Sequence, residues 1–203
     1  AQGIIHPFPI QATTLPMAMN GADIIGQART GTGKTFGFGL PALHQVDIES
    51  ATTQVLIITP TRELCLQVTD DLKVGEARGV TIFPIYGGVG YEPQIEALQN
   101  GVHVIVGTPG RTLDLLNRGD LTLRNIQTLI LDEADHMFDM GFLPAIRRIL
   151  KALPEERQNL LFSATMPKEI RQLADKILYK PHVVELAHSA PAETIDHAQH
   201  ACE

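Results

Sequence analysis

Ala28-Arg29-Thr30-Gly31-Thr32-Gly33-Lys34-Thr35 is the stretch that decides the fold of this chain. Its glycines allow backbone N–H groups to turn inward around phosphates, its lysine adds positive charge, and its threonine hydroxyl is a ligand for Mg²⁺. Alanine stands where such loops usually begin with glycine. The stretch follows Asp23-Ile24-Ile25 and opens a predicted helix, whose positive dipole end would face the phosphates. We therefore interpret it as a phosphate-binding loop rather than as a simple glycine-rich turn.

A second motif, Asp132-Glu133-Ala134-Asp135, directly follows the apolar run 126–131. Open α/β sheets place their ligand crevice at the carboxyl ends of strands. There Asp132 suits a water-mediated contact to Mg²⁺, and Glu133 suits orienting and deprotonating an attacking water. A solvated helix start also favours acids, but it does not explain their place after a buried strand. Asp135 could equally be a structural ion-pair partner. Together the two motifs indicate a site for a nucleoside triphosphate and its metal.

Composition sets the broad class of the protein. A chain of 203 residues with 44% hydrophobic residues is long enough for one domain with a substantial core. It has no apolar run near the roughly 20 residues of a membrane span and no signal pattern, so we expect a cytoplasmic, monomeric protein that does not enter membranes. Cys65 and Cys202 are too few for a disulfide framework or a zinc site.

The net charge of −7 argues against a nonspecific polyanion binder. The charge is unevenly spread, because residues 1–100 contain 5 Lys or Arg and residues 101–203 contain 11. Any nucleic-acid contact must therefore come from a few placed groups.

Apolar, strand-like runs alternate with helical patterns along the chain. The predicted strands are 23–25, 54–59, 80–85, 102–106, 128–131, 159–163 and 182–186. The predicted helical stretches include 33–46, 62–76, 93–100, 111–117, 141–152 and 168–179. This alternation, with runs too apolar for a half-exposed sheet, predicts an α/β domain at 1–186 whose mostly parallel sheet is covered on both faces. Residues 187–203 lose the apolar periodicity and are predicted to be a linker or tail.

Five further segments accompany the two motifs. They are Ile10-Gln11, Pro60-Thr61-Arg62-Glu63-Leu64, Gly87-Gly88, Thr108-Pro109-Gly110-Arg111 and Ser163-Ala164-Thr165. With them, the chain resembles the first RecA-like domain of a DEAD-box RNA helicase, a superfamily 2 ATPase with a P-loop. Seven motifs stand in family order over nearly the whole ordered chain. The residues around Gly87-Gly88, with Asn159-Leu160-Leu161-Phe162, are most similar to the bacterial RhlE-type subgroup.

The resemblance implies roles at an ATP site. Gln11 would read the adenine edge, because its amide both donates and accepts hydrogen bonds. Lys34, Asp132 and Glu133 would be catalytic, and Thr35 and Asp132 would hold Mg²⁺ largely through water. The remaining ATP-binding residues would be Ala28, Arg29, Thr30, Gly31, Thr32 and Gly33.

The resemblance also implies an RNA surface and a partner domain. Backbone amides, hydroxyls and guanidinia would grip the RNA sugar-phosphate chain without reading its sequence. The residues are Pro60, Thr61, Arg62, Glu63, Gly87, Gly88, Thr108, Pro109, Gly110 and Arg111. Asp135, Ser163, Ala164 and Thr165 would couple this domain to a second RecA-like domain. That second domain is missing from the sequence, so the tail at 187–203 would lead toward it.

One departure and two alternatives stand beside this interpretation. Phe8 occupies the position from which a hydroxyl usually caps the helix carrying Gln11, and its side chain cannot cap. A DNA-directed superfamily 2 motor is disfavoured by Gln11 and by the complete acidic tetrad. A nucleotide-gated RNA clamp without turnover is the alternative from another class, and it would not need Glu133.

Overall fold

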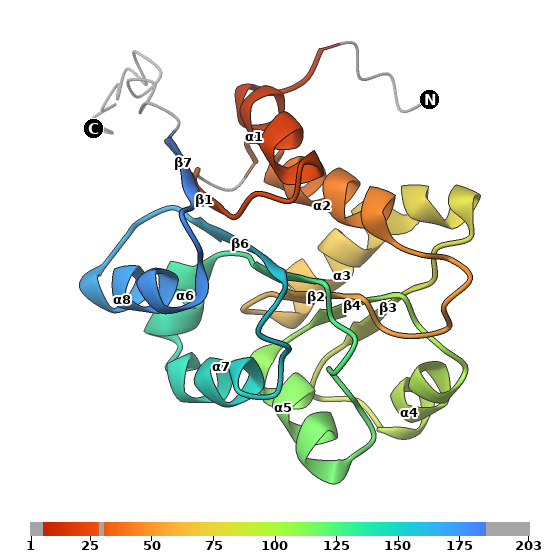
Figure 1. Ribbon diagram of the computed structural model, residues 1–203. Coiled ribbons are helices and arrows are strands. Elements are labelled where there is room, and N and C mark those ends of the chain that lie inside the picture. The colour runs from red at the N-terminus through yellow and green to blue at the C-terminus, as the bar shows by residue number, and fades with distance from the viewer. Residues whose placement is uncertain (1–5, 29–30, 186–203) are drawn as a thin grey trace, which may run out of the picture.

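A computed structural model describes residues 6–28 and 31–185, and its centre is one seven-stranded sheet (Figure 1). The strands are β1 (Ile24–Gln27), β2 (Val55–Ile58), β3 (Ile82–Ile85), β4 (Val104–Gly107), β5 (Thr128–Leu131), β6 (Gln158–Ser163) and β7 (His182–Glu185). They lie in the order β3-β4-β2-β5-β6-β1-β7, and every pairing between neighbours is parallel. The predicted fold class is confirmed, and each predicted strand overlaps an observed one.

Eight α-helices are described around the sheet. They are α1 (Pro9–Met19), α2 (Lys34–Gln45), α3 (Arg62–Leu72), α4 (Glu92–Gln99), α5 (Pro109–Arg118), α6 (Ala134–Asp139), α7 (Leu143–Leu150) and α8 (Lys168–Ile177). The helix expected to carry Gln11 is α1, with Phe8 at its N-cap, whereas α6 lies outside the predicted helical stretches. The stretch predicted at 62–76 changes to a 3₁₀ helix at Lys73–Arg78, which ends at Gly79 in the left-handed conformation.

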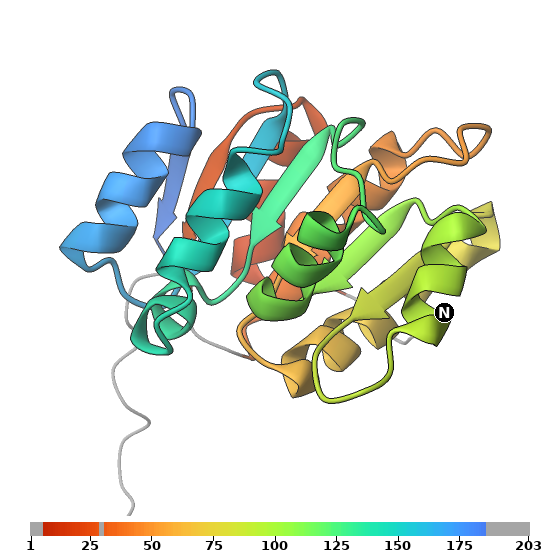
Figure 2. The ribbon, with the colours of Figure 1, turned by 90° about the horizontal axis from the view of Figure 1, so that it is seen from below.

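Helices cover both faces of the sheet, as Figure 2 shows from below. Alternate residues of each buried strand face opposite sides, so Leu56 and Leu129 pack with α5, α7 and α8, whereas Ile57 and Ile130 pack with α1, α2 and α3. A strand buried on both faces needs continuous apolar sequence, which is why these runs show no alternation.

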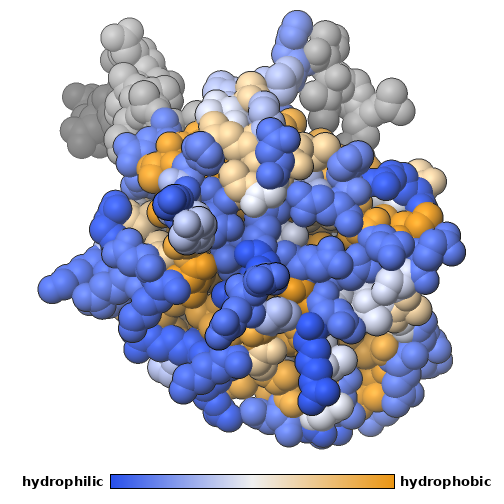
Figure 3. Space-filling view, viewed as in Figure 1, coloured by the Kyte–Doolittle hydropathy of each residue, from blue (hydrophilic) through white to orange (hydrophobic). Residues whose placement is uncertain are grey.

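The visible surface is mainly hydrophilic, with hydrophobic residues in smaller patches between polar ones (Figure 3). None of the helices in the described part of the chain is long and apolar enough to cross a membrane.

The parallel arrangement gathers the carboxyl ends of all seven strands at one edge. The loop after β1 carries the phosphate-loop residues, the loop after β5 carries the acidic tetrad, and Ser163 ends β6. These three strands are adjacent in the order β5-β6-β1. The segments expected to grip RNA follow β2, β3 and β4, which form the neighbouring group β3-β4-β2. The sheet thus separates the two groups of motifs into two halves of one edge.

Candidate functional site: a phosphate loop facing an acidic strand end

Lys34 and Asp132 meet where the phosphate loop faces the end of β5. The Lys34 ammonium lies 3.5 Å from Asp132 Oδ1, and both side chains are buried, with 6% and 4% of their surface exposed. Lys34 is the first residue of α2, and the Asp132 amide continues the pairing of β5 by donating to Ile58 O. Two motifs almost a hundred residues apart are therefore in contact.

Burial is the main reason why the pKa of Asp132 lies above its ordinary value. The nearby Lys34 charge opposes this shift, while Glu133 adds to it. A buried carboxylate with one cation beside it favours further positive charge, because such charge offsets the cost of burial. The site is therefore electrostatically suited to a divalent cation.

Gly33 occupies a position that no other residue fits without strain. Its φ is +79°, in the left-handed region, and a Cβ there would lie 2.6 Å from the Phe8 ring and 2.7 Å from Gln11 Nε2. The start of α1 therefore packs directly against the phosphate loop.

Gln11 connects these two segments. Its Nε2 donates to Gly33 O at 2.9 Å, and its Oε1 accepts from the Phe8 N–H at 3.0 Å. As predicted, the Phe8 side chain makes no cap, so only the glutamine half of a capping box forms. With the other described residues, the Gln11 amide uses one N–H and one lone pair, so it has capacity for one more donor and one more acceptor contact.

Glu133 has an unusual backbone conformation, with φ 53° and ψ 52°. A non-glycine residue in the left-handed region costs about 1–3 kcal/mol, and such strain clusters at functional sites. Its amide donates to Asp132 Oδ1 at 3.0 Å, and its Oε2 lies 3.5 Å from His136 Nδ1. The turn thus separates two adjacent carboxylates, one buried beside Lys34 and one more exposed.

Asp135 joins the acidic tetrad to the end of β6. Its amide donates to Ser163 Oγ, and its Oδ2 accepts from both the N–H and the hydroxyl of Thr165, at 2.8 and 2.9 Å. Burial raises the pKa of Asp135, but hydrogen bonds, first from Thr165 and then from Ser163, outweigh burial and hold the pKa below its ordinary value. Asp135 thus has hydrogen-bond partners in place of the alternative ion pair. Ala164, between the two partners, is exposed.

The segment after β2 forms a capped helix start. Thr61 Oγ1 accepts from the Leu64 N–H, so this hydroxyl caps α3. Arg62 is exposed and its guanidinium stacks over the Tyr86 ring, 4.9 Å from the centroid. Pro60 is buried, while Glu63 is exposed in the first turn of the helix.

Gly87 and Gly88 are open to an approaching ligand. A Cβ at either glycine would meet nothing within 4 Å, and Gly88 has a φ of +81°. The same openness holds at Gly110, behind Thr108 and Pro109 at the start of α5. Backbone groups at these turns are therefore accessible to a chain molecule.

Arg111 faces the protein and not the solvent. Only 7% of its surface is exposed, its guanidinium donates to Val89 O at 2.8 Å and Gly90 O at 3.4 Å, and it stacks 4.2 Å from the Tyr91 ring centroid. The acidic residue of the same helix, Asp114, accepts a hydrogen bond from the Tyr91 hydroxyl. Arg111 thus fastens the loop after Gly88 to α5.

Three residues without a predicted role also belong to this surface, namely Gln94, Tyr86 and Tyr91. Gln94 is buried and its Nε2 donates to Tyr86 O and Gly90 O, so it holds the same loop as Arg111. A glutamine in a short polar helix carries no signal of burial, and an arginine–aromatic contact across two loops leaves no local pattern. Only the three-dimensional structure identifies these residues as part of the surface.

The remaining predicted residues belong to the phosphate loop and to the proposed metal site. Arg29 and Thr30 lie outside the described residues, Gly31 has a φ of +82°, and Thr32 and Thr35 are partly exposed. No cluster of three His, Cys, Asp or Glu suited to a metal ion occurs among the residues that the structure describes. Mg²⁺ typically takes one or two protein oxygens plus phosphate and water ligands. The Asp132 carboxylate and the Thr35 hydroxyl, which is hydrogen-bonded to Asp71, are oxygen ligands of the kind that a Mg²⁺ arriving with a nucleotide would take.

Comparisons with known proteins agree with this geometry. The family described as DEAD/DEAH box helicase matches residues 8–173. Two curated relatives named DEAD-box ATP-dependent RNA helicase CshA are 50% identical, one from Streptococcus pneumoniae over 91% of this chain and one from Geobacillus kaustophilus over 91%. This chain spans only 36% and 40% of their lengths.

Two solved structures share the fold. A DEAD box protein from Methanococcus jannaschii is 42% identical with a TM-score of 0.82, covering 88% of this chain and 49% of the other. A hypothetical ATP-dependent RNA helicase from Sulfolobus tokodaii is 34% identical with a TM-score of 0.84, covering 91% and 54%. These matches leave the RhlE-type subgroup a prediction. With its phosphate loop, acidic tetrad and remaining motifs on one edge of a parallel sheet, the chain belongs to the DEAD/DEAH box helicase family.

Proposed function

We propose that this chain is the ATP-binding domain of an ATP-dependent RNA helicase, which hydrolyses ATP and locally separates RNA duplexes when it works with a second RecA-like domain. The contact between Lys34 and Asp132 carries the proposal, because it brings a phosphate-binding cation and a metal-binding carboxylate to one point. The names of the curated relatives, which match over 91% of this chain, support it.

In this proposal the phosphate loop binds the triphosphate. Backbone N–H groups of the loop and the positive end of α2 face the phosphates, and Lys34 neutralises their charge. Asp132 and the Thr35 hydroxyl hold the Mg²⁺, which when bound stabilises the charge that develops on the phosphates. Gln11 uses its free N–H and lone pair for the adenine edge.

Glu133 is the proposed general base. It orients an attacking water and accepts its proton as the new oxygen–phosphorus bond forms. The bond from the terminal phosphorus to the bridging oxygen breaks in the same displacement, so that ADP leaves with that oxygen and inorganic phosphate is released. The proton stays on the carboxyl until it is released to solvent. The turn at Glu133 keeps this group out of the buried pair made by Lys34 and Asp132. The nearby Asp135 is proposed to couple this site to the second domain, together with its partners Ser163 and Thr165.

The other half of the edge is proposed to bind RNA. Arg62 is exposed for a phosphate, the hydroxyls of Thr61 and Thr108 lie at two helix starts, and the Gly87-Gly88 turn lets a backbone approach closely. We assign Arg111 to holding that turn in place, because its guanidinium already donates to the turn. The surface fixes the register of the RNA and reads no sequence.

A second RecA-like domain is proposed because the chain spans 36–40% of its curated relatives. An arginine supplied across an active site accelerates related phosphoryl transfers by ~10³–10⁵. We therefore expect this chain alone to bind ATP weakly and hydrolyse it negligibly. Its cytoplasmic location and monomeric state remain predictions.

Two substitutions separate binding from chemistry. Lys34→Ala removes a direct phosphate contact and should weaken Mg·ATP binding by this chain in a calorimetric titration. Glu133→Gln keeps the size of the side chain but removes the base, so Mg·ATP should still bind while RNA-stimulated turnover by the full-length protein collapses. Full turnover by Glu133→Gln would refute the assignment of the base.

The same measurements test the RNA clamp. A clamp would hold RNA in the presence of ATP, show no RNA-stimulated turnover, and behave alike with Glu133 or glutamine. The retained Glu133 favours the helicase.

A further inference from the structure

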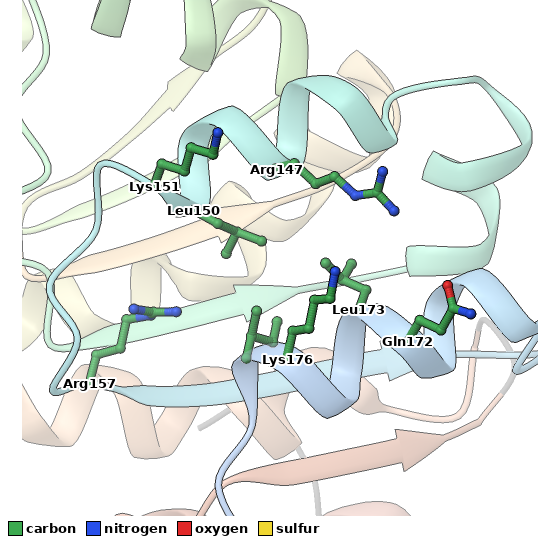
Figure 4. A pocket seen from close by; sticks show the side chains of 8 residues that line it. Arg147, Leu150, Lys151, Arg157, Gln172, Leu173 and Lys176 are labelled. Atoms are coloured by element: carbon green, nitrogen blue, oxygen red, sulfur yellow. The ribbon is translucent and has the colours of Figure 1, made fainter.

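A groove lies between α7 and α8, on the sheet face opposite α2. Its volume is about 340 Å³, and side chains from the two helices face each other across it, as Figure 4 shows. Its lining includes Lys151 just after α7, Arg157 just before β6, and Lys176 near the end of α8. It therefore extends toward the amino ends of the strands, away from the edge that carries the phosphate loop.

The walls of the groove are basic. Its lining includes Arg147, Lys151, Arg157 and Lys176, and no carboxylate from the described part of the chain. None of the four is in an ion pair with another of the described residues. Residues 141–180 hold eight Lys or Arg and four Asp or Glu, a net charge of +4, while the rest of the chain holds eight and nineteen, a net charge of −11. Residues 141–180 thus carry a net positive charge, although the chain as a whole is negative.

Arg157 is held in position within this wall. Its Nε donates to Asn159 Oδ1 at 2.8 Å, and its guanidinium also donates to Pro154 O. Burial lowers its pKa, with Asp23 acting in the opposite direction. An arginine that is partly buried without an ion pair gains when an anion arrives, because the anion offsets its lost hydration.

The floor of the groove is apolar. Leu150, Leu173 and Ile177 line it between the basic walls. Leu150 and Ile177 are partly exposed, whereas Leu173 is buried. The bases of a single-stranded RNA stack on aromatic rings, and none of the lining residues is aromatic. An amphipathic protein segment has both the acidic groups for the basic walls and the aliphatic side chains for the floor.

We propose that this groove binds an acidic, amphipathic segment of a partner protein, with carboxylates on the four basic residues and aliphatic side chains on the floor. An amphipathic helix laid in a groove between two helices is a common recognition mode, and charge complementarity gives it specificity. Because the groove lies away from the proposed ATP and RNA edge, the segment binds without displacing either ligand. This inference is independent of the proposed catalytic function.

The test uses this chain and a synthetic fluorescent peptide. Leucines recur in the peptide at every third or fourth position, and glutamates fill the remaining positions. A scrambled peptide of the same composition and a single-stranded RNA oligonucleotide are the comparison probes. Fluorescence anisotropy should show saturable binding of the amphipathic peptide, with binding of the scrambled peptide weaker by about tenfold, a difference of 1.4 kcal/mol.

Charge reversal locates the binding site. Arg147→Glu with Lys176→Glu should weaken peptide binding by about tenfold or more. The matched control, Lys168→Glu with Arg171→Glu, changes the charge equally at exposed positions of α8 outside the groove, and should change the affinity by less than about twofold. All four positions are exposed, and thermal melting confirms that both variants fold.

Three results would overturn the proposal. Absence of peptide binding would do so, and equal binding of the scrambled peptide would reduce the groove to a nonspecific basic surface. Competition by the RNA oligonucleotide, lost in the groove variant but kept in the control, would assign the groove to RNA.

Discussion

Arg111→Ala should destabilise the protein because the guanidinium makes buried contacts that alanine cannot replace. The substitution removes a hydrogen bond of 2.8 Å to Val89 O, a longer one to Gly90 O and the stacking on Tyr91. A hydrogen bond to a charged group contributes about 1.5–3 kcal/mol, and a cation–π contact at a protein surface about 0.5–1 kcal/mol. The carbonyls lie in a surface loop that water reaches after truncation, so we expect a loss near the lower end, about 2–3 kcal/mol.

Differential scanning calorimetry measures this loss directly. For a domain of this size, about 2–3 kcal/mol corresponds to a fall in Tm of roughly 4–12 °C. Arg62→Ala is the matched control, because Arg62 is exposed and stacks over Tyr86 without a buried hydrogen bond, so its Tm should fall by no more than about 2–4 °C. An Arg111→Ala protein that melts with the wild type would refute the role assigned to Arg111.

The salt dependence of RNA binding by the full-length protein should also differ between Arg62→Ala and Arg111→Ala. Each phosphate neutralised on a single strand contributes about 0.7 log units of affinity per log unit of salt. Arg62→Ala should lower the salt slope by about one such unit and weaken all RNA sequences alike. Arg111→Ala should leave the slope unchanged while weakening binding, because the loop after Gly88 is no longer held in place. A slope reduced equally by both substitutions would show that Arg111 contacts phosphate.

The other predictions concern the nucleotide half of the edge. Gly33→Ala should lower the free energy of unfolding by about 1–2 kcal/mol, because alanine is strained at this left-handed φ. The added methyl group would also crowd Phe8 and Gln11, so calorimetric titration should show weaker Mg·ATP binding. Unchanged affinity would mean that the loop rearranges freely. Gln11→Ala should narrow the difference between ATP and GTP affinity by ~1–3 kcal/mol, and an unchanged preference in the same titration would exclude Gln11 from base recognition. The lowered pKa of Asp135 means that its stabilising effect is present above the ordinary carboxyl pKa and is lost as the pH falls through the lower folded value. Asp135→Asn should therefore be less stable near neutral pH, with the difference in urea unfolding shrinking in acid, and a difference independent of pH would contradict this.

The fold was predictable because strand burial leaves a strong signal. Runs such as 54–59 and 128–131 are apolar throughout, and this pattern arises when both faces of a strand are covered. The helix α6 was not predicted, since its six residues, which begin within the acidic tetrad at Ala134, are too few to establish a helical period. The start of α1 was expected only from the family resemblance around Gln11. Its own pattern gives no helical signal, because Pro16 lies inside it and its apolar residues do not form one face.

The ATP half of the site was predictable at the level of which residues meet. Contact between Lys34 and Asp132 follows once β1 and β5 lie near each other in a parallel sheet, since both loops leave the same edge. The bonds from Thr165 to Asp135 follow in the same way from the adjacency of β5 and β6. The turn at Glu133 was not predictable, because left-handed glutamate is disfavoured locally and is imposed by its surroundings.

Arg62 and Arg111 show where local sequence reasoning stops. Each follows a strand and a proline by the same logic, and the sequence predicts the same exposed, RNA-facing role for both. Arg62 stacks over Tyr86 and remains exposed, so its guanidinium stays at the surface. Arg111 instead donates to carbonyls 21 and 22 residues away, in a loop whose Gly90 carbonyl also accepts a hydrogen bond from Gln94. The difference depends on how the loop after β3 folds back onto α5, and no pattern within either segment encodes that long-range contact.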